Sequence, residues 1–503
     1  MRIVWWWLAA VFAAQAGLVQ GVVLEHVSGR PLARTLVQLQ PVAKAGSVPQ
    51  TLSLRSQNGG QFTFEHVPNG LYLIVATRNN YFPAAYGQRR PSGQGTPVEV
   101  TEDSTIFAEL HMRHKGAVTG RVLDENGVGM SDAPVLVYRA RLPIRLAGSA
   151  ISDDRGVYRI HGLEPGKYWI RSGAFVLEDG AGLLPTFGPE SLESREARIH
   201  VVTLDADTPD ADVRPEQGRL FRVTGVLQCP TDGIPVTVTI SSETMRRSVQ
   251  SACGGGFTFE GIAPAICEVF AIKQGGLESG FIDLPVYRDE VANMVLTPPG
   301  RVSLEVVRPG SYTPSDIPVT VTARRSDLYS ADVERVLQVS DSKLTLAPGH
   351  WEMSATAGPG QYVESIGNGF AAYRRNRAEQ PSDWFDVYID AGRSSRIRIT
   401  VSDKAAQIAG NVMGDGKGIA GAPVFLWPLA EQARKSLRGW KQVLTDADGY
   451  YKFDGLPPGD YRLLSTFDIS EVDEEVLDEA QAVTVKVEVS QKSSLDLAVW
   501  VAP

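Results

Sequence analysis

Cysteine is scarce in this chain: 3 of its 503 residues. So few cysteines over such a length do not make a disulfide scaffold. A basic excess is also lacking, because 49 Lys and Arg face 58 Asp and Glu and give a formal net charge of -9. Nucleic-acid binding needs a basic surface to neutralise phosphates. We therefore expect no nucleic-acid partner, and no electrostatic attraction to anionic lipid.

Catalytic motifs are lacking as well. No Gly-x-Ser-x-Gly elbow occurs, which leaves an α/β-hydrolase nucleophile without support. The stretch His161–Glu164 matches the short His-x-x-Glu pattern of zinc peptidases, but it falls on a turn that recurs elsewhere without those residues. His111 and His114 lie at a strand end and in a linker, where a solvated role is favoured over a ligand role. We expect no catalytic residue, cofactor site or metal site.

Long hydrophobic runs are absent beyond the N-terminus. Met1-Arg2, the apolar run Ile3–Ala13 and Ala14-Gln15-Ala16 match the three regions of a secretory signal peptide. Cleavage after Ala16 predicts a secreted chain, whether periplasmic, cell-surface or extracellular, with no membrane span. No charge occurs between Arg2 and Glu25, so retention as a membrane anchor is the alternative.

Helical periodicity is nearly absent, with Ser470–Ala480 as the exception. Strand periodicity takes its place, clearest in Thr445–Leu464, where Tyr451 and Phe453 alternate with polar residues. A tight turn precedes this segment, and Gly455–Gly459 turns the chain toward a second strand. We interpret the stretch as a hairpin.

The same pattern recurs about once per hundred residues, the size of one sandwich domain. The hairpin recurs at Gly60–Tyr72, Gly156–Tyr168, Gly255–Cys267 and, in part, Leu344–Trp351. An opening strand with a glycine turn precedes it at Gly21–Gly29, Gly120–Gly127, Gly225–Gly233 and Gly410–Gly416. Alternating strands close the units, for example at Val98–Val100 with Ile106–Met112 and at Val483–Val487 with Leu495–Val499.

About seven short strands per repeat predict an all-β chain, a tandem array of about five transthyretin-like or Ig-like β-sandwiches. We expect the following boundaries: 1–16 signal peptide, 17–113, 114–216, 217–298, 299–402 and 403–503. The third domain holds the cysteines, and the fourth departs furthest from the pattern. Linkers such as Met112–Lys115 and Pro298–Gly300 are short. We expect the domains to form a rod or an arc.

The repeat resembles the carboxypeptidase regulatory-like domain, which has a transthyretin-like fold and is similar to carbohydrate-binding-like and Cna-B-type repeats. The resemblance is good over Gly116–Gly173 and Ala409–Ser465 and poor over Arg301–Thr356. It implies a β-sandwich. It implies no particular function, because such domains are appendages of peptidases, surface proteins and outer-membrane receptors. No catalytic zinc-peptidase domain accompanies the repeats.

Acidic turns and cysteines complete the candidate sites. Asp446–Gly449 resembles the start of an EF-hand loop but lacks its closing Glu, and Asp and Asn are also common in ordinary turns. We favour turn chemistry over calcium. In the repeat alignment Cys267 takes an inward core position, so we favour a Cys229–Cys253 disulfide, although three pairings are open.

Aromatic residues outside the repeat core are the candidates for ligand contact. They are Tyr81 and Tyr86 in the first domain, Phe187 in the second and Trp384 in the fourth. Exposed and coplanar, they would form a sugar-binding platform. The alternative, which we favour, is that they pack as lids on the sandwich ends.

The repeats occupy nearly the whole chain and leave no room for a catalytic domain. The sequence therefore indicates a secreted, non-enzymatic binding, scaffold or adhesive protein of the cell envelope, with an envelope protein or polysaccharide as partner. A carbohydrate-binding module array is the first alternative. An accessory subunit of a peptidase or outer-membrane receptor is the second. Ligand and oligomeric state stay open.

Overall fold

A computed structural model describes residues 17–42, 50–91, 93–140, 145–177, 182–229, 233–242, 244–275, 278–325, 335–338, 344–367 and 383–502. The predicted signal peptide, 1–16, lies outside the described residues. The described chain is an array of β-sandwiches, so the predicted fold class is confirmed. Five hydrophobic cores, each from one consecutive stretch, define units 1 to 5. The domain boundaries themselves stay a prediction.

The first two units contain the following strands. Unit 1 consists of β1 (Gly17–Glu25), β2 (Leu36–Pro41), β3 (Leu52–Arg55), β4 (Gln61–Val67), β5 (Gly70–Thr77), β6 (Ala84–Ala85), β7 (Val98–Val100) and β8 (Thr105–Met112). Unit 2 consists of β9 (Gly116–Arg121), β10 (Pro134–Arg139), β11 (Leu146–Ile151), β12 (Val157–Leu163), β13 (Gly166–Ser172), β14 (Phe175–Val176), β15 (Gly182–Leu183), the 3-10 helix η1 (Ser194–Glu196), β16 (His200–Val202) and β17 (Asp207–Thr208).

In their described residues, the next two units consist of strands joined by turns and loops. Unit 3 consists of β18 (Phe221–Gln228), β19 (Pro235–Ser242), β20 (Met245–Ala252), β21 (Gly256–Ile262), β22 (Ala265–Lys273), β23 (Ser279–Val286), β24 (Glu290–Val291) and β25 (Met294–Val295). Unit 4 consists of β26 (Gly300–Val307), β27 (Thr320–Arg325), β28 (Arg335–Gln338), β29 (Leu344–Leu346), β30 (Gly349–Thr356), β31 (Tyr362–Gly367), β32 (Phe385–Ile389) and β33 (Ser394–Ser402).

Unit 5 adds two short helices. Its elements are β34 (Ala406–Gly414), β35 (Lys417–Gly418), β36 (Pro423–Pro428), α1 (Glu431–Leu437), β37 (Lys441–Leu444), β38 (Tyr450–Leu456), β39 (Gly459–Ser465), α2 (Glu474–Glu479), β40 (Val483–Val487), β41 (Lys492–Ser494) and β42 (Leu497–Ala498). The sequence predicted α2, though its N-cap is Asp473, whose side chain accepts a hydrogen bond from Val476 N. It missed α1, which has only 7 residues.

The predicted hairpin is wrong in its pairing. In unit 5, β38 pairs with β34, whereas β39 pairs with β36 and β40 in the other sheet. The same separation holds for β4 and β5 and for β12 and β13. Both strands have one apolar face, and these faces meet across the core, so the turn joins the two sheets. The closing strands likewise lie apart: β7 pairs with β5, while β8 runs parallel to β1.

A hydrogen bond recurs at this turn and explains the aromatic residue that follows it. The Tyr72, Tyr168 and Tyr461 hydroxyls donate to the carbonyls of Pro68, Glu164 and Pro457, at 3.0, 2.8 and 2.6 Å. In unit 4, the Trp351 indole N–H donates to Ala347 O at 2.9 Å. Each side chain thus fills the core and satisfies a turn carbonyl four residues back, as in the tyrosine corner of Ig domains. Cys267 occupies this position in unit 3.

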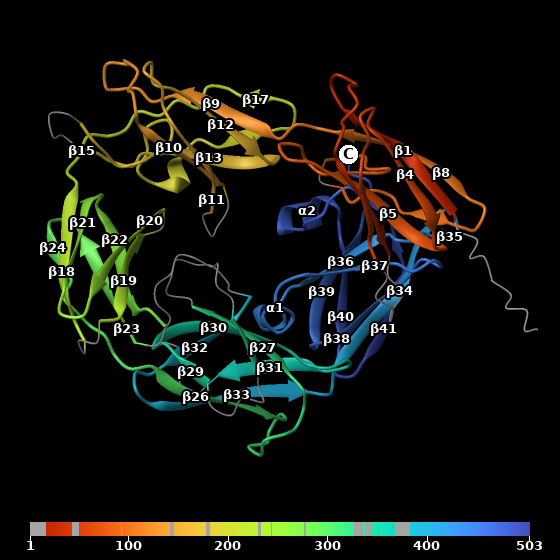
Figure 1. Cartoon of the computed structure of the whole chain (residues 1–503). Coiled ribbons are helices and arrows are strands. Elements are labelled where there is room, and N and C mark those ends of the chain that lie inside the picture. The colour runs from red at the N-terminus through yellow and green to blue at the C-terminus, as the bar shows by residue number, and fades with distance from the viewer. Residues whose placement is uncertain are drawn as a thin grey trace, which may run out of the picture.

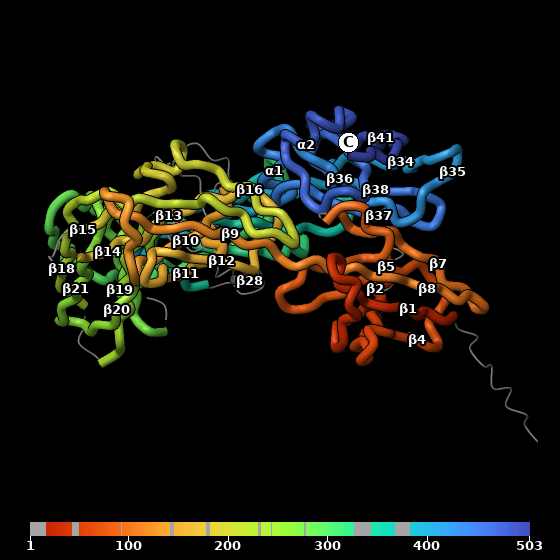
Figure 2. Tube along the Cα trace, turned by 90° about the horizontal axis from the view of Figure 1, so that it is seen from above, coloured from red at the N-terminus to blue at the C-terminus, as the bar shows by residue number. Residues whose placement is uncertain are grey.

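The units are arranged as a ring, and the expected rod or arc is wrong. Figure 1 shows unit 1 (red) followed by units 2, 3 and 4, with unit 5 (blue) back beside unit 1. Edge-on, units 1 and 5 lie at opposite sides of the ring's mean plane, so the two ends of the chain overlap (Figure 2). A hydrogen bond from Gln442 Nε2 to Gln94 Oε1, 2.9 Å long, connects these ends.

Contacts between neighbours hold the rest of the ring. Between units 2 and 3, the Tyr138 hydroxyl donates a hydrogen bond to Thr244 O at 3.0 Å. Between units 3 and 4, the Arg325 guanidinium lies 4.1 Å from the Phe270 ring centroid. Between units 4 and 5, the Ser436 hydroxyl donates to Val363 O at 2.5 Å. Lys167 of unit 2 also lies 3.8 Å from Glu475 in α2 of unit 5. Every unit therefore contacts its neighbours through side chains as well as through the linkers.

Candidate functional site

A basic cleft lies where unit 1 meets units 2 and 5. Its volume is about 370 Å³, within the usual range for small-ligand sites. The lining consists of His26, Phe82, Pro83, Gln88, Arg89, Arg90, Pro91, His111, Arg113 and Leu204. Five of these side chains are Arg or His, and none is Asp or Glu. In a chain with a net charge of -9, three arginines and two histidines on one surface mark the cleft as a candidate binding site.

Backbone contacts gather the lining segments around the end of β8. His26 N, in the turn after β1, donates to Met112 O at 2.9 Å, and Phe82 N donates to Arg113 O at 2.8 Å. The Gln88 side chain shapes the loop that carries Arg89 and Arg90. Its Oε1 accepts from Ala85 N at 3.0 Å, and its Nε2 donates to Pro91 O at 2.8 Å and Gly93 O at 2.9 Å. The amide thus satisfies three backbone groups of one loop.

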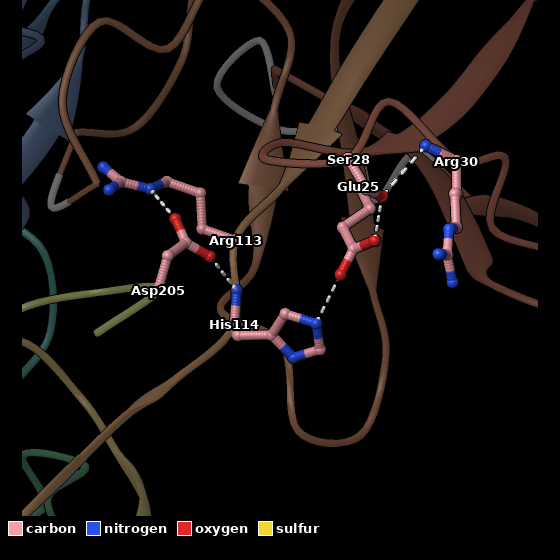
Figure 3. Close-up of polar contacts among 6 residues, drawn as sticks. All are labelled: Glu25, Ser28, Arg30, Arg113, His114 and Asp205. Atoms are coloured by element: carbon pink, nitrogen blue, oxygen red, sulfur yellow. Dashed lines mark hydrogen bonds and ion pairs between the residues drawn. The ribbon is translucent and has the colours of Figure 1, made fainter. Parts of the chain in front are cut away.

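At the joint between units 1 and 2, Asp205 holds the Arg113 side chain and the His114 backbone in place (Figure 3). Asp205 Oδ2 accepts from Arg113 Nε at 2.5 Å, and Asp205 Oδ1 accepts from His114 N at 2.6 Å. Asp205 N in turn donates to His114 O at 2.9 Å. The carboxylate is 9% exposed, and its residue has a φ of 61°, a left-handed conformation that Asp tolerates better than most residues.

Glu25 extends this network into unit 1. His114 Nε2 lies 2.6 Å from Glu25 Oε1, and the Ser28 hydroxyl donates to the other carboxylate oxygen (Figure 3). These hydrogen bonds, first that of Ser28 and then that of His114, lower the pKa of Glu25 below 4.5. The Tyr81 ring lies 4.1 Å from the His114 ring, at an interplanar angle of 32°. The network therefore ties unit 1 to the linker that leads to unit 2.

The joint between units 1 and 5 fixes Arg89 and Arg90. Arg89 Nε lies 3.4 Å from Asp468 Oδ1, and Arg90 Nη2 donates to Ala502 O at 2.9 Å. Asp468 is 2% exposed, and its Oδ2 accepts from Ala502 N at 3.0 Å. Gln94 N donates to Phe467 O at 3.1 Å. The carboxylates that balance Arg89 and Arg113 thus come from units 5 and 2 and lie outside the cleft lining.

The candidate aromatics of the sequence lie mainly at joints. Trp384 is 4% exposed and lies between two guanidiniums, that of Arg324 at 4.4 Å and that of Arg438 of unit 5 at 4.3 Å from its ring centroid. Phe187 is 2% exposed and packs beside Tyr138, at the joint with unit 3.

Tyr81 stacks on His114, as described above, and Tyr86 packs against the core of unit 1. These four side chains do not form the exposed coplanar platform that sugar binding requires. The reason is that the faces of such rings are large apolar surfaces, which the joints and cores bury. The alternative, in which they act as lids on the sandwich ends, stays a prediction.

The histidines and acidic turns form no metal centre in the part of the chain that the structure describes. Glu164 pairs with Arg139 at 2.6 Å, and His200 is buried, which lowers its pKa. In the acidic turn, Asp446 Oδ1 accepts from Asp448 N at 3.0 Å and Tyr450 N at 2.9 Å, which is ordinary turn chemistry.

The cysteines of unit 3 are divided between a bridge and the core. The structure contains a Cys229–Cys253 disulfide and leaves Cys267 free and buried. Burial raises the pKa of the Cys267 thiol to about 11. This side chain thus lies inside the sandwich as a small apolar group.

The basic cleft was not among the sites that the sequence predicted. Its basic residues come from three separate segments of unit 1. These are His26, the adjacent pair Arg89 and Arg90, and His111 with Arg113. A signal existed only in that doublet and in the spacing His111-x-Arg113, and neither is distinctive. Their approach depends on how β1, β6 and β8 end beside one another.

Comparison with known proteins gives little beyond this. No family model matches the chain, and no curated protein matches it. Among solved structures, the minor pilin GBS52 of Streptococcus agalactiae is similar over 41% of this chain and 97% of its own, at 13% identity and a TM-score of 0.26. The pilus protein RrgB of Streptococcus pneumoniae aligns over 77% of this chain and 98% of its own, at 8% identity and a TM-score of 0.15.

The major pilin subunit BcpA of Bacillus cereus aligns over 76% of this chain and 99% of its own, at 10% identity and a TM-score of 0.14. TM-scores this low carry no argument about arrangement or function. The resemblance to the carboxypeptidase regulatory-like domain stays one of sequence motif. Among the described residues, no helix is long and apolar enough to cross a membrane.

Proposed function

We propose that this chain is a secreted, non-catalytic binding or scaffold protein of the cell envelope, and that its partner is an envelope protein. The observation that carries the proposal is the closed ring. Unit 1 contacts unit 5 through Arg89–Asp468, Gln94–Phe467 and Gln94–Gln442, so the chain holds its sandwiches in fixed relative positions. A fixed array presents surfaces at defined spacing, which suits the assembly of partners. The N-terminal signal pattern supports work outside the cell.

The joints support a structural role for several groups that could otherwise be assigned to chemistry. Trp384, Tyr81, His114 and Asp205 all take part in contacts between units or between a unit and its linker. Because these charged and aromatic residues contact other units or the linker, we assign them to holding the ring together and not to ligand binding. The basic cleft, by contrast, combines accessible polar groups with a hollow surface.

The test uses the mature chain, residues 17–503, with isolated envelope material. The envelope is used untreated, digested with protease, or oxidised with periodate to destroy sugar diols. The proposal predicts saturable binding that protease removes and periodate leaves. Loss with periodate alone would favour the carbohydrate-binding array instead. Absence of saturable binding to untreated envelope would contradict the proposal.

A further inference from the structure

We propose that the basic cleft binds an acidic peptide segment of a protein partner. The inference deepens the function proposed above and rests on it for the existence of a protein partner. The cleft lining contains the side chains of Arg89, Arg90 and Arg113 with those of His26 and His111, and no carboxylate; the carboxylates that pair with Arg89, Arg113 and His111 are those of Asp468, Asp205 and Glu109, outside the lining. Such a surface attracts anions and repels cations.

Arg113 and Arg89 are oriented so that donors remain for a ligand. Arg113 uses Nε for Asp205 and Nη2 for Leu204 O, and its Nη1 bonds to no described residue. Arg89 contacts Asp468 through Nε, and its two terminal nitrogens bond to no other described residue. Guanidinium groups held in this way can donate paired hydrogen bonds to a carboxylate, and less side-chain entropy is lost on binding.

The apolar part of the lining favours a peptide over a sugar. Phe82, Pro83, Pro91 and Leu204 share the cleft with the basic groups. Phe82 supplies one ring, and the neighbouring Tyr81 ring is stacked against His114, so the lining offers no row of coplanar aromatic faces for a sugar. Aliphatic side chains can pack on Pro and Leu while adjacent carboxylates reach the arginines. A segment in which acidic and aliphatic residues alternate therefore fits the lining.

The cleft is a composite site, because three units contribute to it. Unit 1 supplies the basic side chains, unit 2 supplies Leu204 and the partner of Arg113, and unit 5 supplies the partner of Arg89. An opened ring would release Arg89 and Arg90 from their positions. Ligand binding and ring closure are thus coupled, and each favours the other.

The experiment measures fluorescence anisotropy of a labelled octapeptide of alternating Glu and Leu, titrated with residues 17–503. The control peptide has Gln in place of Glu. We expect saturable binding that weakens as salt is added, with the Gln peptide at least tenfold weaker. Arg113→Gln should lower affinity roughly tenfold, because a charge-assisted hydrogen bond is lost. Arg246→Gln, at an exposed position on β20 of unit 3, is the matched control and should leave affinity unchanged.

A second variant guards against an indirect effect through the joint. The double variant His26→Gln with His111→Gln alters the cleft without touching a contact between units. It should also weaken the peptide. Equal binding of both peptides, or unchanged affinity in both variants, would overturn the proposal, as would displacement of the peptide by dextran sulfate at far lower concentration. Envelope binding that persists in these variants would overturn the cleft assignment alone.

Discussion

The two joints that flank the basic cleft are built in different ways. The joint between units 1 and 2 follows the chain: Arg113 and His114 belong to the linker, and Asp205 binds both. The joint between units 1 and 5 connects segments from opposite ends of the chain, through Gln94, Phe467 and Asp468. Both joints hold a nearly buried carboxylate, Asp205 in the first and Asp468 in the second. Asp205 accepts short hydrogen bonds from Arg113 and from the His114 amide, whereas Asp468 lies 3.4 Å from Arg89 Nε and the second joint also brings backbone segments together.

The difference shows that contacts between consecutive units and contacts between the first and last units are both needed to close the ring. A short linker keeps units 1 and 2 near each other, so a few polar bonds suffice to set their orientation. Units 1 and 5 have no such linker. The joints between the units that lie between them must therefore bring unit 5 back beside unit 1. Errors at any joint would move unit 5 away from unit 1. The contacts between units 1 and 5 are therefore the contacts most sensitive to a change at any other joint.

The largest effect is expected at the first joint, from Asp205→Ala. The change removes the acceptor of Arg113 and of the His114 amide, and it places alanine at a left-handed φ of 61°. Because Arg113 is 36% exposed, solvent screens part of the loss. We expect the free energy of local opening to fall by about 2–3 kcal/mol. Hydrogen exchange of the Lys115 amide, which donates to Asn80 O, measures it.

Asp205→Asn is the matched control, because asparagine tolerates the same backbone conformation and retains a side-chain acceptor. Asp205→Asn should lower the free energy of local opening by roughly half as much as Asp205→Ala does. If both substitutions leave the exchange rate unchanged, the carboxylate does not organise this joint.

A smaller effect is expected at the second joint, from Gly93→Ala. An added Cβ would lie 2.5 Å from Phe467 O, closer than real contacts allow, so unit 5 must shift. Such overpacking costs about 1–3 kcal/mol. We expect faster exchange of the Gln94 amide and unchanged exchange in the unit cores. Gly367→Ala, where the added atom meets nothing within 4 Å, should be silent. Unaltered Gln94 exchange would place the units farther apart than described.

The smallest effect is a pH dependence of amide exchange, which we expect at the first joint before the second. Hydrogen bonds from Ser28 and His114 lower the pKa of Glu25 below 4.5. A lowered pKa means that this contribution to stability is present above about pH 4.5 and is lost as pH falls through the lower folded value. Lys115 exchange should therefore accelerate in acid before Gln94 exchange does. Glu25→Gln should remove that pH dependence, and its persistence would assign the effect to another group.

The sandwich cores could be predicted from sequence because period-2 alternation reports burial directly. Phe62, Phe64 and Val67 of β4 are buried, and in three other units a glycine with positive φ precedes the last inward residue, for example Gly162 before Leu163. The pairing of β4 and β5 could not be predicted. A turn between two half-buried strands has the same pattern whether the strands are neighbours or face each other across a core.

The cleft and the ring could not be predicted for a related reason. Arg89, Arg113 and Asp468 are ordinary charged residues in sequence, and their roles arise from the relative placement of the units. Trp384 was a candidate ligand aromatic because it lies outside the repeat core. The Arg438 guanidinium of unit 5 lies 4.3 Å from the Trp384 ring centroid, and no motif connects that residue with unit 4. Contacts between domains leave no periodic signal in a single sequence.

Zero-length cross-linking tests the closed ring most directly. A carbodiimide joins an amine to a carboxylate without a spacer, and Lys167 of unit 2 lies 3.8 Å from Glu475 of unit 5. Lys115 and Glu164, also 3.8 Å apart, form the matched control pair, which does not involve unit 5. We predict both cross-links in the monomer fraction after peptide mass spectrometry. A Lys115–Glu164 link without a Lys167–Glu475 link would contradict the closed ring.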